Sequence, residues 1–430
     1  MTAYQFRLFV RAAPWLLVAL AAGMAVRIGL SVDTGLAALS DTRIYRAGVL
    51  AWLDGKDVYT TLLSGGARPG YYTYPPFSLL PIGLVLAWYP LGAFVFTAGT
   101  AAAMFHILVL VLARIRPSLP HRPLIAAVGT VCALELEPLI HTLYWGQVNV
   151  FLLWLVALDC LHRNPRWPRG LLVGVAAAIK LTPLVFVLFF LLGRQVRPAL
   201  VAAGSFAACT GLAWAIAPRD SAFYWTRAVW DPVRIGNVAL PGNQSLRGFV
   251  ARLGPLPNPL PAPLKGSLPG ATLLWAALAV AAAGLAAVVV VRYRRAGSDV
   301  PAWLATAALG TLVSPMSWTH HWVWFAPLLM AAAGWAGRVP RLAVPALVLA
   351  GAVAVFAPPE QFPASPDAPW WTHVLGESYV VAGLLVLVGF ALLPSRLLPR
   401  GEPLQAAPDG LQHGATSTGH LPAGAGRSAS

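Results

Sequence analysis

Long apolar runs separated by short polar stretches dominate this chain. Each run is about 20 residues long, which is the length that an α-helix needs to cross a bilayer. Clear examples are residues 12–32, 91–113, 198–217, 271–291, 339–357 and 376–393. The runs lack the period-two alternation of membrane strands. Because backbone groups in lipid must be satisfied within helices or a closed barrel, the pattern predicts an all-α, polytopic transmembrane bundle.

Composition supports this interpretation. Of the 430 residues, 58% are hydrophobic and only 10% are charged, whereas soluble domains carry about 25% charged residues. Most of the surface is therefore expected to face lipid. The apolar runs predict about 11–13 spans.

The formal net charge of +15 does not indicate a nucleic-acid-binding protein. The arginines fall in short clusters between apolar runs, as the positive-inside rule produces. If these clusters are cytoplasmic, both termini lie inside and the other loops face outward. The predicted outward loops are residues 33–74, 142–148, the turn near Lys180, 219–270, 314–321 and 358–375.

Two segments do not fit simple crossings. Residues 75–89 predict a short or re-entrant helix, and residues 170–193 predict a helix broken at Lys-Leu-Thr-Pro, 180–183. Irregular backbone at membrane depth occurs where it lines a cavity. Both segments therefore favour a water-filled, outward-facing pocket.

The organisation predicted is one membrane domain over residues 1–395. Residues 396–430 are rich in Gly, Ala, Ser and Pro, a composition typical of disorder, and are interpreted as a cytoplasmic tail. Cys132, Cys160 and Cys209 lie within apolar runs, so neither a disulfide nor a metal site is expected from them.

Asp41, in the first polar stretch after the first apolar run, is the leading candidate for chemistry. Its alternative role is to cap the following helix, since Asp is a favoured N-cap residue. Lys180 precedes Thr-Pro at the helix break. A purely structural Lys180 would extend to the membrane interface, but its distance from the arginine clusters favours a functional role.

Further candidates occupy the later outward loops. His320 and His321 stand beside tryptophans of the kind that anchor membrane interfaces. A zinc site is not expected there, because the sequence offers no third ligand at helical spacing. Gln147 is a candidate with the alternative of capping the next helix. Glu137 is also a candidate, because intramembrane carboxylates are often functional. It ranks below the residues named above, and His141, one turn later, is its expected partner.

The order of these motifs along the chain resembles that of glycosyltransferase family 87, over roughly residues 10–395. The motifs are Asp-Thr-Arg-Ile-Tyr at 41–45, Tyr-Pro-Pro at 74–76, Gly-Gln-Val-Asn at 146–149, Lys-Leu-Thr-Pro at 180–183, Gly-Asn-Gln-Ser at 242–245 and Ser-Pro-Met-Ser-Trp-Thr-His-His at 314–321. The resemblance implies a membrane-embedded GT-C fold with an active site on the extracytoplasmic face. It also implies transfer of a hexosyl group, most plausibly mannose, from a polyprenyl-phosphate sugar to a lipid-linked or glycan hydroxyl.

By this resemblance Asp41 is the catalytic base. Cations and donors are then needed for the leaving phosphate, and partners for the sugar hydroxyls. The predicted phosphate contacts are Lys180, one of His320 and His321, and Arg43 or Arg247, since adjacent histidines cannot both point into one pocket. The predicted sugar contacts are Gln147, Asn149, Asn243 and Gln244, with Trp318 or Tyr74 on a sugar face.

Neither a cofactor nor a metal is expected, and the reaction is expected to invert the anomeric centre. Asp33, Asp54 and Asp57 share the first outward loop and could bind a cation. Two alternatives remain open. The sugar could be arabinofuranose or glucose, or the chain could be a lipid or sugar transporter, because broken helices and intramembrane acids also occur in transporters.

Overall fold

Helices make up most of the described part of the chain. The computed structural model describes residues 3–29, 39–65, 69–231, 234–254, 269–356, 358–362 and 369–398. Within these ranges the only β-type pairings are two isolated bridges, Leu63 with Gly70 and Asn243 with Trp318. The all-α prediction is confirmed. Asp33 and residues 399–430 lie outside the described residues.

Three helical stretches are long and apolar enough to cross a membrane. They are Tyr89–Ile115, which comprises α4, a π-helical turn and α5, then α11 (Val196–Ile216) and α14 (Gly270–Arg295). Two bent pairs raise the number to five if each is one span: α6 (Arg122–Ala133) with α7 (Glu137–Trp145), bent by 75°, and α19 (Trp370–Gly376) with α20 (Ser378–Leu392), bent by 71°. The chain is a multi-pass membrane protein, and the predicted number of 11–13 spans stays a prediction.

The remaining α-helices complete the described fold. They are α1 (Ala3–Gly29), α2 (Ser40–Leu53), α3 (Leu79–Leu86), α8 (Asn149–Leu161), α9 (Leu171–Ile179), α10 (Phe186–Leu192), α12 (Pro218–Thr226), α13 (Leu246–Arg252), α15 (Asp299–Val313), α16 (Phe325–Trp335), α17 (Pro340–Phe356) and α18 (Pro358–Gln361). Short 3₁₀ turns include η1 (Pro76–Ser78), η3 (Thr182–Val185) and η7 (Thr319–His321).

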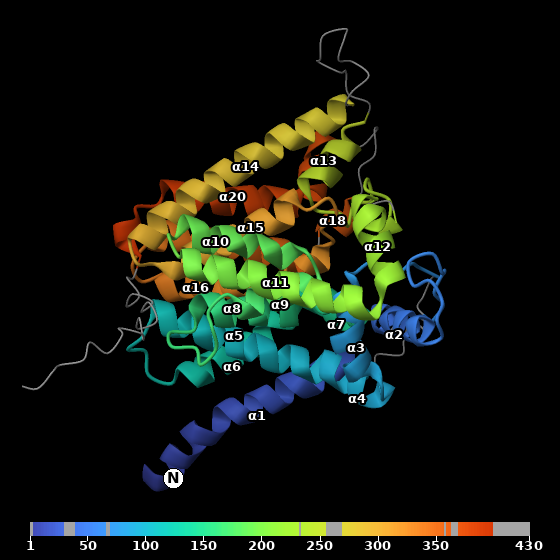
Figure 1. The fold of residues 1–430 in the computed structure, drawn as a ribbon. Helices are drawn as coiled ribbons and strands as arrows, with labels where there is room; N and C mark the ends of the chain where they lie inside the picture. Colours follow the sequence, from blue (N-terminus) through green and yellow to red (C-terminus); the bar gives the residue numbers. More distant parts are fainter. Residues whose placement is uncertain are drawn as a thin grey trace, which may run out of the picture.

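The helices stack in a bundle whose ends differ in character (Figure 1). Helices α5, α8, α9, α11 and α15 run roughly alongside one another, with α1 packed on α6 at one side and α14 packed on α15 at the other. Helices α2, α3 and α12 gather at one end. That end carries the loops in which the sequence concentrates its polar motifs.

A buried ion cluster marks the opposite end. Arg114 at the end of α5 and Arg294 at the end of α14 both pair with Asp299, the first residue of α15. Helix α15 then runs about 22 Å, at 1.5 Å per residue, before reaching Ser314. The arginine cluster and the polar loops therefore lie at opposite ends of one helix.

The predicted helix breaks are present. Helix α9 ends at Ile179, Lys180 is extended with φ −150° and ψ 130°, and the chain resumes as η3 and α10. Residues 76–86 form the short helical segment η1–α3 that the sequence predicts. Whether either segment dips into the membrane stays a prediction.

Candidate active site

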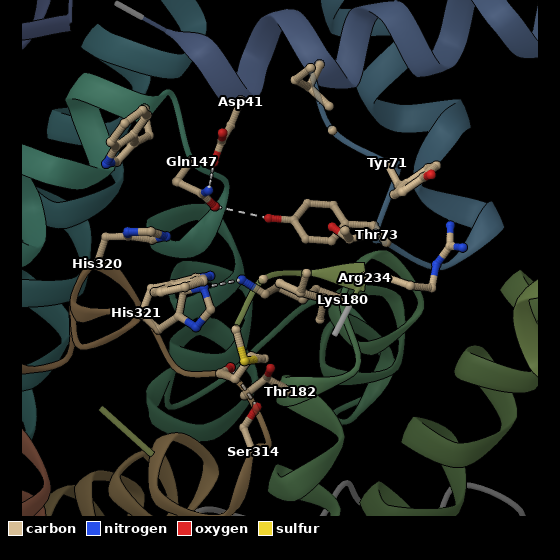
Figure 2. Close-up of a pocket in the computed structure, with 18 of the residues that line it drawn as sticks. Asp41, Tyr71, Thr73, Gln147, Lys180, Thr182, Arg234, Ser314, His320 and His321 are labelled. Atoms are coloured by element: carbon tan, nitrogen blue, oxygen red, sulfur yellow. Dashed lines mark hydrogen bonds between the residues drawn. The ribbon is translucent and has the colours of Figure 1, made fainter. Parts of the chain in front are cut away.

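A cavity of about 1090 Å³ opens where the polar loops meet. Its size is slightly above the range of about 300–1,000 Å³ that is usual for ligand pockets. The sequence-predicted residues that line it are Asp41, Tyr74, Gln147, Lys180, Trp318, His320 and His321. Figure 2 shows Asp41, Gln147, Lys180 and His321 turned toward one another from segments far apart in the chain.

The junction of α2 and α7 holds Asp41 in place. Leu39, in the left-handed region with φ 54°, donates its N–H to the carbonyl of Tyr144 over 2.7 Å. The Thr42 hydroxyl donates to the carbonyl of Gly146 over 2.9 Å. Asp41 thus sits in the first turn of α2, where the helix dipole favours a negative charge.

The capping role for Asp41 is wrong. Leu39 occupies the N-cap position of α2, and no side chain caps that end. The carboxylate of Asp41 instead accepts a hydrogen bond from the Gln147 side-chain amide. The acid is therefore held toward the cavity and away from the backbone of its own helix.

Gln147 is the centre of a buried hydrogen-bond network. Its Oε1 accepts from the hydroxyls of Tyr74 at 3.0 Å and Tyr45 at 3.1 Å, and these hydroxyls lie 2.8 Å apart. Since the amide oxygen is occupied in this way, the amide nitrogen is directed at Asp41. The network therefore fixes which side of Gln147 meets the acid.

Lys180 is fixed from three sides. Its Nζ donates to Asn149 Oδ1 over 2.8 Å and lies 3.1 Å from His321 Nε2. The ammonium also lies 5.2 Å from the centre of the Tyr74 ring, within cation–π range. Asn149 does not line the cavity among the described residues; it positions Lys180, and its Nδ2 donates to the carbonyl of His320 over 3.0 Å.

Burial tunes the acid and the amine toward neutral pH. It raises the pKa of Asp41 to about 6, although the Gln147 hydrogen bond and the charge of Lys180 act in the opposite direction. It lowers the pKa of Lys180 to about 7, against the attraction of Asp41. A carboxylate with such a pKa is a better proton acceptor at pH 7 than an ordinary aspartate.

The two histidines differ in what they contact. Burial holds the pKa of both imidazoles well below the ordinary value, so both are neutral at pH 7. His321 is engaged by Lys180, whereas the buried Nε2 of His320 has no hydrogen-bond partner in the described part of the chain. His320 can therefore meet a ligand as a hydrogen-bonding group rather than as a cation.

Two predicted sugar contacts lie behind the cavity wall. Asn243 is fully buried and donates to the carbonyl of Val238 over 2.8 Å, while its Oδ1 accepts from the N–H of Ser317. Gln244, also fully buried, donates to the carbonyl of Gly376 over 2.7 Å. Both amides are used by backbone groups and hold the wall together, and neither residue is among the described residues that line the cavity.

The two predicted phosphate arginines also lie elsewhere. Arg43 is two residues beyond Asp41 on α2, and positions i and i+2 of a helix do not share a face. Arg247 stacks over Trp275 with its Cζ 5.3 Å from the ring. Neither is among the described residues that line the cavity.

One cluster near the cavity could hold a metal ion. Ligand atoms of Glu137, His141 and Glu360 all lie within 4.8 Å of one another. Glu137 is buried, however, and its two oxygens accept from the hydroxyls of Thr319 and Tyr379 and from His141. Donors on both oxygens are typical of a carboxylate that links helices, here α7, η7 and α20.

Some residues that line the cavity were not predicted from the sequence to be site residues. Arg234, Tyr71 and Thr73 line one side of the cavity, and Glu360 of α18 lines another part. Arg234 belongs to no recognisable motif. Only the pairing of distant loops brings it to the site.

The sequence of this chain is similar to that of known proteins. The sequence profile described as Glycosyltransferase family 87 matches residues 72–315. A relative from Mycobacterium tuberculosis (strain ATCC 25618 / H37Rv), named polyprenol-phosphate-mannose-dependent alpha-(1-2)-phosphatidylinositol mannoside mannosyltransferase, is 36% identical over 394 residues, covering 84% of this chain and 88% of the relative. A protein of the same name from Mycolicibacterium smegmatis (strain ATCC 700084 / mc(2)155) is 33% identical over 388 residues, covering 84% and 86%.

The chain is also similar in structure to ArnT from Cupriavidus metallidurans bound to undecaprenyl phosphate. The match has a TM-score of 0.43 and 15% identity, covering 91% of this chain and 76% of that one. The family match extends over more than half of the chain, and the relatives align over most of their length. The chain belongs to glycosyltransferase family 87.

Proposed function

We propose that this chain transfers a mannosyl group from a polyprenyl-phosphate mannose to a hydroxyl of a phosphatidylinositol mannoside-type lipid. The relatives that align over 84% of the chain carry this donor and this class of acceptor in their names. The observation that supports it most is the network that brings Asp41 and Lys180 to one cavity from distant segments.

In this proposal Asp41 is the general base. The acceptor hydroxyl oxygen attacks the anomeric carbon, its proton passes to the Asp41 carboxylate, and the bond from the anomeric carbon to the phosphate oxygen breaks. Polyprenyl phosphate leaves with the electron pair. A single displacement inverts the anomeric centre and needs no second, nucleophilic carboxylate.

Lys180 offsets the charge that grows on the leaving phosphate. Because its pKa is lowered, the amine of Lys180 is only partly protonated at pH 7 in the free enzyme. A bound phosphate, which is negatively charged, favours the protonated form. The neutral His320 donates or accepts one further hydrogen bond through Nε2, and His321 keeps Lys180 in position. Trp318 lines the cavity and offers an aromatic face for the sugar.

The active site is proposed to face the extracytoplasmic side, with both termini in the cytoplasm. The separation of the Arg114–Asp299–Arg294 cluster from the cavity along α15 supports this orientation, since basic residues favour the cytoplasmic ends of spans.

The purified full chain in lipid nanodiscs tests the proposal. It is incubated with radiolabelled polyprenyl-phosphate mannose and a phosphatidylinositol mannoside, and lipid products are separated. Labelled, α-mannosidase-sensitive lipid is expected. Matched reactions with polyprenyl-phosphate arabinofuranose, polyprenyl-phosphate glucose and GDP-mannose identify the donor. Transfer from one of these, with none from the mannose lipid, contradicts the proposal.

A further inference from the structure

Arg234 forms one side of the cavity, away from the two histidines. Figure 2 shows it beside Tyr71 and Thr73, with Lys180 between this group and His321. The residue follows the loop after α12, and its N–H donates to the carbonyl of Asp231. It is therefore a second basic group in the cavity, separate from Lys180.

Aromatic rings hold its guanidinium in a defined plane. The Cζ atom of Arg234 lies 4.7 Å from the centre of the Tyr71 ring and 5.6 Å from that of Phe223. Its Nη2 donates to the carbonyl oxygen of Tyr59. These contacts use the faces and one corner of the guanidinium and leave the other N–H groups available.

None of the ion pairs among the described residues includes Arg234. A planar guanidinium with unused donors suits the oxygens of a phosphodiester, which it can bind in a two-pronged manner. The hydroxyls of Tyr71 and Thr73 line the same side of the cavity and can add hydrogen bonds.

The proposed reaction brings two phosphodiesters into one cavity. One belongs to the donor and must lie next to the reacting carbon; the other belongs to the head group of the acceptor and only needs to be held. Lys180 is linked to the base directly through Asn149 and Gln147. Among the described contacts, Arg234 reaches that network by a longer route: it donates to the carbonyl of Tyr59, whose hydroxyl donates to the carbonyl of Tyr74.

We propose that Arg234 binds the phosphodiester of the acceptor lipid, and that the enzyme thereby selects acceptors with an anionic head group. This inference rests on the proposed function. It assigns the donor phosphate to Lys180 and the acceptor phosphate to Arg234.

The test compares Arg234→Gln with the wild-type chain and with Arg227→Gln. Arg227 is a matched control: its Cζ lies 5.8 Å from the same Phe223 ring, but it is exposed and not part of the described cavity lining. Steady-state kinetics are measured with a phosphatidylinositol mannoside and with an uncharged mannosyl diacylglycerol. Donor and acceptor concentrations are varied separately.

Arg234→Gln is expected to raise the KM for the anionic acceptor about tenfold or more, the loss typical of a charge-assisted contact. The donor KM and the rate with the uncharged acceptor should change by less than about twofold, because in this assignment the donor phosphate binds Lys180 and the uncharged acceptor offers no phosphodiester to Arg234. Arg227→Gln should behave as wild type. A raised donor KM, or an equal loss with both acceptors, overturns the proposal.

A binding measurement separates this inference from the proposed function. The anionic lipid should raise the thermal stability of wild type and Arg227→Gln, and not that of Arg234→Gln. If the lipid stabilises wild type selectively but no mannose is transferred, the proposed function fails and the Arg234 site stands. If mannose is transferred and Arg234→Gln responds to the lipid as wild type does, the Arg234 site is wrong and the function stands.

Discussion

Asp41 and Lys180 have pKa values moved toward each other by burial, to about 6 and about 7. The base must be ionised and the amine protonated for the proposed reaction. The value of kcat/KM should therefore fall as the pH drops through about 6, and fall again as it rises through about 7. Initial rates at low donor concentration between pH 4.5 and 9, roughly the range that brackets both limbs, check this. A flat profile across both values contradicts the assignment.

Replacement of Lys180 tests the alkaline limb by itself. Lys180→Gln keeps a hydrogen bond to Asn149 but removes the charge, so kcat should fall about 100-fold or more. The decline above pH 7 should disappear while the acidic limb remains. Lys56→Gln is the control, because Lys56 is exposed and pairs only with Asp54 in the described structure. A variant that keeps the alkaline limb assigns that limb to another group.

Which polar residues face the cavity was only partly predictable from the chain. Asp41 and Lys180 are charged residues that follow apolar runs and lie apart from the arginine clusters. This position indicates a functional role before any fold is known. Asn243 and Gln244 are also polar residues of a predicted outward loop, yet their amides donate to the carbonyls of Val238 and Gly376. Polarity in an outward loop does not distinguish a ligand contact from a residue that joins two loops.

At the scale of elements, the contact between α2 and the turn after α7 decides where the base lies. Gly146 has φ +68°, and a Cβ there would lie 1.9 Å from Thr42 Oγ1. Gly146→Ala should therefore push α2 away and cost about 1–3 kcal/mol, within the range for a strained backbone position. Thermal unfolding in detergent and transfer rates measure the two consequences.

Gly211→Ala is the matched control, because a Cβ at Gly211 in α11 meets nothing within 4 Å. It should retain activity and stability. Unchanged stability and turnover in Gly146→Ala contradict the role given to this junction.

The Glu137 cluster leads to a prediction about metals. Since hydroxyl and imidazole donors occupy both oxygens of Glu137, the carboxylate is expected to link α7, η7 and α20 without an ion. Transfer should continue in excess EDTA. Loss of activity that added Mg²⁺ or Mn²⁺ restores would contradict this and point to Glu137, His141 and Glu360 as ligands.

The helices themselves followed closely from the apolar runs. Residues 198–217 and 271–291 correspond to α11 and α14, and the break at Lys180 appears where Thr-Pro predicts it. The bend of 75° between α6 and α7 was not predicted. It arises where α7 begins at Glu137-Pro138 after an extended Leu136, and α7 packs on η7 beyond the bend.

At the scale of the whole molecule, we expect the cavity end and the Arg114–Asp299–Arg294 end to lie on opposite sides of the membrane. In a cysteine-free background, Leu62→Cys near the cavity end should react with a membrane-impermeant maleimide added to intact cells. Arg295→Cys at the far end should react only after the membrane is opened. Both side chains are exposed, so the reverse pattern would contradict the proposed orientation.

The most direct measurement is single-turnover mannosyl transfer by Asp41→Asn in the purified full chain. The amide keeps the size of the side chain and a hydrogen bond with Gln147, so folding and donor binding should be retained. Loss of the base should lower the transfer rate by about 10²–10⁴-fold. A rate near that of wild type, with the variant folded and the donor bound, would contradict the assignment of Asp41 as the base.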